Sequence, residues 1–369
     1  MNVASSLQQS LLLVEQSSRI MATNVSVHLA VPPAEEASAQ AAIETCMDWL
    51  REVERRLTRF DPTSELSQLN DAAGEWRPAS ALLFSAVQEA IRAAASSAGL
   101  FDPALLPQLQ ALGYDRDFAQ LARHADATTQ TGSAVPVSTG SWRGIQMDAR
   151  GRRIRLPEGT RLDLGGIAKG WAADMTLKRS LRAFPNVIVN VGGDLRLRGE
   201  RSPGEPWAVG IRDPRYDHLP GPAPNIAVFT FHRGGLATSG ATSRWWYHGG
   251  QRQHHLLDPR TGRPARLWVP AGDDSAEASD AERLIATATA LAPTAARAEV
   301  AAKVALLRGY PDALRAVEDA WEQRGKPGAS LQADEQVALL LVLGNGEVFM
   351  SKNMEEYLDT CGRGGMVWV

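Results

Sequence analysis

The fold is decided by residues 162–194, which read LDLGGIAKGWAADMTLKRSLRAFPNVIVNVGGD. After the glycine pair Gly165-Gly166, apolar residues recur at helical spacing, so we predict a helix over Ala168–Ala183. The largely apolar, β-branched run Val187–Val191 then predicts a buried strand, which a second glycine pair closes. A helix followed by a buried strand indicates a protein that combines a sheet with covering helices.

The same mixture of strands and helices continues on both sides of this unit. We expect strands at 25–30, 154–157, 207–211, 226–231 and 284–290, helices at 35–57, 79–97, 295–307 and 313–323, and a terminal hairpin of 337–343 and 347–351 with a type I′ turn at Asn345-Gly346. We find no internal repeat. The chain is therefore expected to form an N-terminal tail (1–17) and one two-lobed α/β domain (18–369) with mixed sheets, flanking helices and a mobile insert at 272–282.

The charge balance limits the classes of partner. The 369 residues include 39 Lys and Arg against 42 Asp and Glu, a formal charge of -3, so nucleic acid is not an expected partner. No window approaches the ~18 to 20 apolar residues of a membrane-spanning helix, so no membrane insertion is expected. The N-terminal residues lack the pattern of a secretory signal, and only two cysteines are present, which favours a cytoplasmic location.

The segment Asp163–Gly170 is a candidate anion site. Backbone N–H groups near a glycine pair and a helix N-terminus can approach an anion, and Lys169 adds a positive charge in the first turn. The spacing matches neither the Walker A loop nor the G-x-G-x-x-G motif. A tight turn with a solvated lysine would explain the same residues.

Three further segments could carry chemistry or could be plain turns. They are Asn190–Asp194, a glycine turn that needs positive φ; Ala237–Gly240, a polar turn with two hydroxyls; and His254–Gly262, which contains an Asp-Pro-x-Thr-Gly turn. The histidines of the last segment can transfer protons near neutral pH. A Ser-His-Asp hydrolase is disfavoured because the chain has no G-x-S-x-G elbow.

Taken in order, these segments resemble the FAD:protein FMN transferases, the ApbE-like flavin transferases, from about residue 20 to residue 351. The resemblance also covers Met21-Ala22-Thr23, where the family has Met-Gly-Thr, the run from Phe60 to Asn70, and Gly99–Pro103. It implies a reaction that moves FMN from FAD to a Thr or Ser hydroxyl of a partner protein and releases AMP with the help of Mg²⁺. Seven segments in the family's order make the match specific.

The resemblance also implies the site residues. FAD would be contacted by Met21, Phe60, Leu100, Phe101, Asp102, Asp163, Lys169, Thr238, Ser239 and Leu257, with Phe60 as an aromatic platform for the isoalloxazine. His255 would handle the proton of the acceptor hydroxyl, and Asp258 would orient it. The acceptor protein would carry a Ser/Thr-Gly-Ala-Thr-like motif. Because residues 239–242 read Ser-Gly-Ala-Thr, self-modification at Thr242 is a second hypothesis beside a plain loop.

The implied metal set departs from the family pattern. It consists of Gly166, Ala295, Glu299 and Lys303, where Glu299 replaces an Asp and Lys303 replaces a Thr one helical turn later. A charged lysine has no acceptor atom for a metal. Either the Lys303 ammonium neutralises the diphosphate in place of Mg²⁺, or the metal site and the activity are lost. An exposed Glu-Lys helix pair would be the ordinary explanation.

Two other functions remain open from the sequence. An FAD pyrophosphatase would use water as the acceptor and give FMN and AMP. A degenerate family member would bind FAD without catalysis. The products formed from FAD distinguish these functions from transfer.

Overall fold

The computed structural model describes residues 10–121, 141–217, 219, 221, 223–269, 283–323, 337–359 and 367–368. An eight-stranded antiparallel sheet forms its centre, in the order β1-β2-β6-β7-β11-β16-β17-β18. The strands are β1 Leu12–Ile20, β2 Thr23–Val31, β6 Val187–Val191, β7 Asp194–Arg198, β11 Arg233–Gly240, β16 Ile285–Ala292, β17 Ala338–Leu343 and β18 Val348–Met350. The main helices are α1 Glu36–Leu57, α2 Glu65–Asp71, α3 Ala81–Ser96, α4 Leu106–Ala111, α5 Ala168–Arg179, α7 Ala295–Arg308 and α8 Asp312–Gln323.

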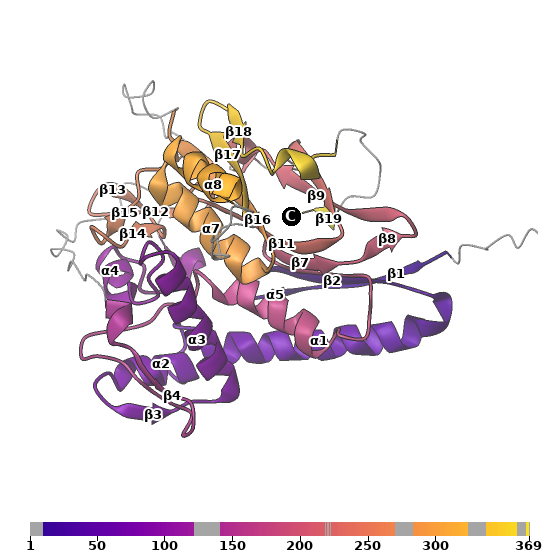
Figure 1. Cartoon of the computed structure of the whole chain (residues 1–369). Helices are drawn as coiled ribbons and strands as arrows, with labels where there is room; N and C mark the ends of the chain where they lie inside the picture. Colours follow the sequence, from indigo (N-terminus) through magenta and orange to yellow (C-terminus); the bar gives the residue numbers. More distant parts are fainter. Residues whose placement is uncertain are drawn as a thin grey trace, which may run out of the picture.

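The central sheet is buried on both faces (Figure 1). Helices α1 and α5 cover β2 and β6 on one face, while α7 and α8 continue this layer over β11, β16 and β17. A second sheet covers the other face through Trp207, Val209 and Phe229. Its strands are β8 Glu200–Ser202, β9 Glu205–Arg212, β10 Asn225–Phe231 and β19 Val367–Trp368. The mixed α/β fold predicted from the sequence is thus confirmed.

Smaller elements lie at one end of the central sheet. In Figure 1, α2, α3 and α4 gather there below two short strand pairings further along the chain. These are β12 Trp245–His248 with β13 Gln251–His254, and β14 Leu257–Asp258 with β15 Arg263–Pro264. A three-stranded sheet of β3 Trp76–Pro78, β4 Gln146–Asp148 and β5 Arg153–Arg155 completes this end.

Three strands of the central sheet, β1, β7 and β11, were not predicted. Residues 12–17, expected in a tail, belong to β1, which pairs with β2 over its whole length. Strand β1 is the edge of the sheet and mixes polar with apolar residues, so its hydrophobic alternation is weak. Residues 237–240, expected as a polar turn, lie instead within β11 at the centre of the sheet.

The terminal hairpin forms as predicted, but its turn is not type I′. A type I′ turn needs positive φ at both central residues, whereas only Gly346 of the Asn345-Gly346 pair has it, at 87°. The Asn345 side chain accepts a hydrogen bond from the Glu347 N–H instead. The predicted insert at 272–282 lies outside the described residues. None of the described helices meets the length and hydropathy that crossing a membrane requires.

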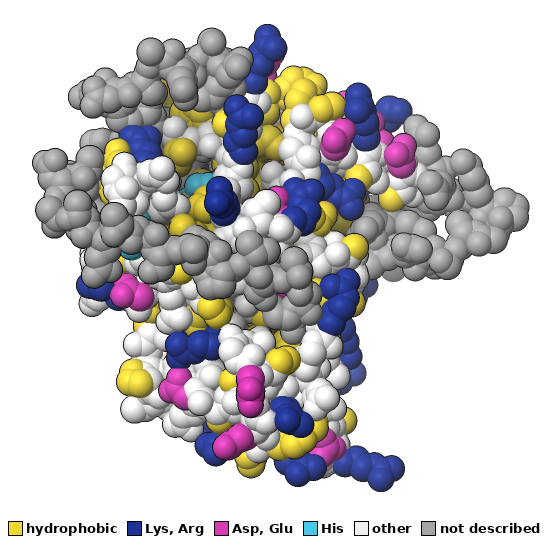
Figure 2. All heavy atoms as spheres, turned by 90° about the vertical axis from the view of Figure 1, so that its left-hand side faces the viewer, with side chains coloured by type: hydrophobic (Ala, Val, Ile, Leu, Met, Phe, Trp, Pro, Cys, Tyr) yellow, Lys and Arg dark blue, Asp and Glu magenta, His cyan; other side chains and the backbone are white. Residues whose placement is uncertain are grey.

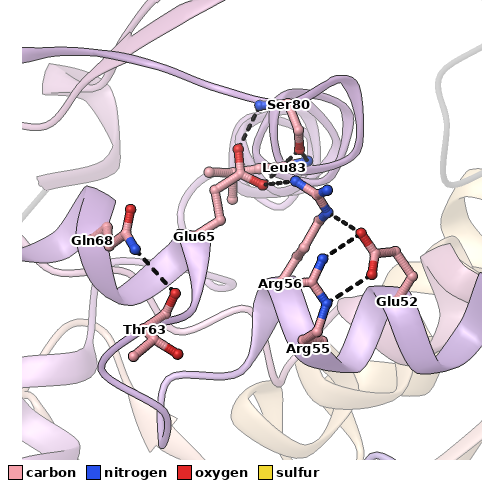
Figure 3. A network of polar contacts seen from close by, with 8 residues as sticks. All are labelled: Glu52, Arg55, Arg56, Thr63, Glu65, Gln68, Ser80 and Leu83. Atoms are coloured by element: carbon pink, nitrogen blue, oxygen red, sulfur yellow. Dashed lines mark hydrogen bonds and ion pairs between the residues drawn. The ribbon is translucent and has the colours of Figure 1, made fainter.

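A partly buried carboxylate, that of Glu65, fixes three helices at the end of the sheet (Figure 3). Glu65 accepts hydrogen bonds from the Ser80 N–H and hydroxyl, and Arg56 pairs with both Glu65 and Glu52. Glu65 begins α2, Ser80 is the N-cap of α3, and Arg56 and Glu52 lie in the last turns of α1. The loop from Thr58 to Ser64 is therefore held at both of its ends.

We predict that Glu65→Ala lowers the free energy of unfolding by about 2 kcal/mol, because the substitution leaves Arg56 and the Ser80 N–H without their shared acceptor. Urea unfolding measures the loss. The matched control is Glu75→Ala, at an exposed position, which is expected to stay within about 0.5 kcal/mol of the unaltered chain. Equal losses in the two variants would contradict the role of this network.

Candidate functional site

A cavity of about 410 Å³ opens where the β1–β2 turn, α4 and the N-terminal end of α5 meet. Most residues that the sequence predicted for the site line it: Met21, Phe60, Leu100, Phe101, Asp102, Asp163, Gly166, Lys169, His255, Leu257 and Lys303. Figure 2 shows the face with α4 and β12–β15, where histidine, Lys/Arg and hydrophobic side chains lie next to one another. The cavity therefore offers apolar walls and positive charge together.

An aromatic cluster forms one wall of the cavity. The Phe60 ring is 41% exposed, and its centroid lies 5.9 Å from that of Tyr114, which lies 5.0 Å from that of Trp246. The Arg59 guanidinium lies over the Phe60 and Tyr114 rings, 4.2 Å from the Phe60 centroid and 4.4 Å from the Tyr114 centroid. An exposed ring such as Phe60, packed against Tyr114, suits the flat face of a conjugated heterocycle.

Asp163 is held beside this aromatic wall. Its carboxylate lies 3.3 Å from the Arg59 Nε and accepts a hydrogen bond of 2.7 Å from the Gly165 N–H. Arg59 also donates to the Tyr114 carbonyl at 2.9 Å. Arg59 and Tyr114 were not predicted as site residues, because neither a single arginine after a helix nor a tyrosine after a glycine forms a recognisable motif.

The floor of the cavity is a cluster of two lysines and two carboxylates. Lys169 forms an ion pair with Asp194, and its Nζ lies 3.9 Å from the Glu299 Oε1. The Lys303 Nζ lies 3.1 Å from the same Glu299 oxygen. The second oxygen, Oε2, accepts a hydrogen bond of 2.9 Å from the Gly170 N–H. Glu299 is fully buried, so α7 is tied through this one carboxylate to α5.

The pKa shifts within the cluster follow from burial and charge. Burial opposes ionisation of Glu299, but Lys303 and Lys169 outweigh it and lower the pKa of this carboxyl. Burial likewise opposes the charge on Lys169, yet Asp194 and Glu299 raise the pKa of its ammonium group. Burial and the charge of Glu299 raise the pKa of Asp194. Lys169 therefore stays charged at neutral pH.

A divalent cation does not fit this residue set. Both Glu299 oxygens already accept from Lys303 or Gly170, and an ammonium group has no lone pair for a metal. Gly166 lies against the aliphatic part of the Lys303 side chain. The Ala295 carbonyl packs against Gly170, where an added Cβ would lie 2.6 Å from the carbonyl oxygen. Across the ranges that the structure describes, no three His, Cys, Asp or Glu side chains gather to hold a metal.

Arg244 and His255 complete the cationic side of the cavity. Arg244 follows the β11 segment, is half-buried, and has no ion-pair partner among the described residues. Burial, then the positive charge of Arg244, lowers the pKa of His255 well below its usual value, and Lys303 adds to the effect. The buried Nδ1 of His255 has no hydrogen-bond partner in the described part of the chain. Arg244 was not predicted, since isolated arginines are common on surfaces.

Several predicted residues lie away from the cavity. Thr238 hydrogen-bonds Thr289 across the β11–β16 ladder at 2.9 Å, and Ser239 is buried in the same strand. Neither residue lines the cavity, because β11 pairs on both sides within the central sheet. Thr242 is only 3% exposed and donates to the Asp217 carboxylate at 2.6 Å, which argues against its self-modification.

Asp258 does not orient His255. Its carboxylate accepts hydrogen bonds from the Arg260 N–H and guanidinium, the closest at 2.8 Å, which stabilise the Asp-Pro-x-Thr-Gly turn. These hydrogen bonds, together with the charge of Arg260, lower the pKa of Asp258. The turn positions the neighbouring Leu257 and Pro259 on the cavity wall, so Asp258 has a structural role.

A cavity with an aromatic wall and a cationic floor suits a ligand that is both aromatic and anionic. The model of the ApbE family matches residues 21–324, and the chain belongs to this family. An FAD:protein FMN transferase of Rhodobacter capsulatus is 31% identical over 252 residues, which are 67% of this chain but 46% of the relative, so the chain spans about half of that protein. One of Treponema pallidum is 30% identical over 68% of this chain and 71% of its own length.

Solved structures share the fold. The crystal structure of the ApbE protein from Thermotoga maritima has a TM-score of 0.71 at 23% identity, covering 94% of this chain and 99% of that one. The flavin transferase ApbE from Vibrio cholerae has a TM-score of 0.67 at 21% identity, covering 94% and 100%. At these identities the likeness supports the fold alone.

The β1–β2 turn places Met21 at the cavity with unfavourable backbone angles. Met21 and Ala22 both have a φ of 55°, and the Met21 N–H donates to Glu54 at 2.7 Å. A left-handed conformation costs a non-glycine residue about 1 kcal/mol or more. The backbone at Met21 and Ala22 is therefore strained, whereas a glycine would adopt the same angles without strain.

We predict that Ala22→Gly raises the free energy of unfolding by about 0.5 kcal/mol, because relief of the left-handed strain exceeds the added chain entropy of glycine. The matched control, Ala41→Gly on the exposed face of α1, should lower it by about 1 kcal/mol. Thermal and urea unfolding give both values. A loss of stability at both positions would contradict the assigned strain.

Proposed function

We propose that this chain transfers FMN from FAD to a Ser or Thr hydroxyl of a partner protein and releases AMP. The observation that carries the proposal is the single cavity that joins the aromatic wall of Phe60 and Tyr114 to the cations Lys169 and Lys303. This pairing suits a dinucleotide in which a flat isoalloxazine is attached to a diphosphate. Curated relatives at 30–31% identity carry the same activity in their names.

The geometry supports the following chemistry. The acceptor oxygen attacks the phosphorus on the FMN side of the diphosphate, and the bond from that phosphorus to the AMP oxygen breaks. The electron pair of the broken bond stays on AMP, where Lys169, Lys303 and Arg244 offset the developing charge. His255, neutral at pH 7, accepts the hydroxyl proton. No step is assigned to magnesium, because the Lys303 ammonium lies against Glu299.

The identity of the acceptor protein and the cellular compartment remain predictions. A protein with an exposed Ser/Thr-Gly-Ala-Thr-like segment is the proposed partner, and the cytoplasm is the proposed location. Incubation with FAD and a test protein that carries such a segment distinguishes the candidate functions. Covalent flavin on the test protein supports transfer, free FMN with AMP supports hydrolysis by water, and unchanged FAD supports binding alone.

We predict that His255→Ala reduces transfer at least about 100-fold while leaving FAD affinity within a few fold, because the loss falls on proton removal. The exposed His232→Ala, outside the cavity, is the control and should retain full activity. In-gel flavin fluorescence of the test protein reports transfer.

The pH profile gives a second readout of the same residue. A lowered pKa keeps His255 in its basic form as pH falls through 6.5, so the transfer rate should not decline until the pH is well below that value. A decline centred near the ordinary histidine pKa, or full activity of His255→Ala, would contradict the proposed base.

A further inference from the structure

The arrangement of charges on the cavity floor supports an inference that goes beyond the proposed function and rests on it. The two carboxylates lie behind the ammonium groups: Asp194 is 1% and Glu299 0% exposed at the side chain. The side chains of Lys169 and Lys303 remain 19% and 14% exposed and line the cavity. The floor therefore presents cations to a ligand and keeps its anions beneath.

The hydrogen-bond capacity of this layer is only partly used. Each ammonium group has three N–H donors. Lys169 forms its ion pair with Asp194, while Lys303 donates to the Glu299 carboxylate at 3.1 Å and, at 3.5 Å, to the carbonyl of the same residue. Donors thus remain for the oxygens of a bound anion. The buried carboxylates hold both ammonium groups in place before any ligand arrives, which reduces the entropy lost on binding.

Arg244 adds a positive charge to the cavity and forms no ion pair with a carboxylate of the described residues. Its guanidinium is close enough to Lys169 and His255 to lower the pKa of each through its charge. Three cations from three separate parts of the chain therefore converge: α5 gives Lys169, the segment after β11 gives Arg244, and α7 gives Lys303. A planar guanidinium can hold two phosphate oxygens at once.

We propose that Lys169, Arg244 and Lys303 form a metal-free cradle for the diphosphate of FAD, in which the Lys303 ammonium does the work of a divalent cation. The cradle neutralises the non-bridging oxygens in the bound state and the leaving AMP oxygen as the bond to it breaks. Glu299 and Asp194 are positioning residues, since they contact the lysines and not the ligand.

The experiment measures the dissociation constants of FAD and of riboflavin by quenching of flavin fluorescence, in excess EDTA and in excess Mg²⁺. Riboflavin is the ligand control because it has the ring system without any phosphate. For the full chain we expect FAD affinities within about twofold in the two conditions. An affinity at least tenfold weaker in EDTA would overturn the proposal.

Variants test the cradle itself. Arg244→Gln and Lys303→Gln should each weaken FAD binding in EDTA about tenfold or more and leave riboflavin binding unchanged. The matched controls are Arg266→Gln and Lys178→Gln, at exposed positions outside the cavity, which should change neither. Because Lys303→Gln removes a partner of buried Glu299, thermal unfolding is recorded, and Arg244→Gln carries the test should the lysine variant not fold.

The outcomes separate this inference from the proposed function. Unchanged FAD affinity in Arg244→Gln, or equal losses for FAD and riboflavin, would overturn the cradle. FAD binding that requires Mg²⁺ would overturn the cradle while leaving the transferase in place. The absence of FAD binding under both conditions would overturn the proposed function as well.

Discussion

The site depends on one buried carboxylate, that of Glu299. A buried charge is tolerated only when it is fully paired and hydrogen-bonded, and this one meets Lys303 and Lys169 on one oxygen and the Gly170 N–H on the other. Removing a partner from such a group is costly, so the positions of α5 and α7 relative to each other are strongly constrained. The two helices, held in these positions, form the floor of the cavity.

The contact between the two helices is close as well as charged. Gly170 allows the Ala295 backbone to approach to a distance that any larger residue would block. Asp174, one turn further along α5, accepts hydrogen bonds from the Ala295 and Ala296 N–H groups at 3.0 Å and so caps α7. These contacts direct Lys303 toward the same space as Lys169. The aromatic wall is fixed separately, since Glu65 and Arg56 hold the loop that carries Phe60.

Much of this could be predicted from the sequence. Helix α1 has strong apolar periodicity, and strand β6 is a continuous, largely apolar run. Eleven of the predicted site residues line one cavity, because turns and helix starts have recognisable sequence patterns. The misses have physical reasons. Strand β1 is half polar and lies at a sheet edge. The Thr238 hydroxyl hydrogen-bonds across a strand pair, and the Asp258 carboxylate pairs with Arg260, two residues further along the chain. Arg244, Arg59 and Tyr114 belong to the site only through tertiary contacts, which leave no local pattern.

The central claim is that one cavity holds an isoalloxazine against Phe60 and a diphosphate against Lys169, Arg244 and Lys303 without a metal. A crystal structure of the chain with FAD, grown in EDTA, tests it most directly. We expect diphosphate oxygens within hydrogen-bond distance of Lys303 and Arg244, and the flavin ring in contact with Phe60. A diphosphate placed away from these cations, or one bridged to Glu299 by a metal ion retained despite EDTA, would contradict it.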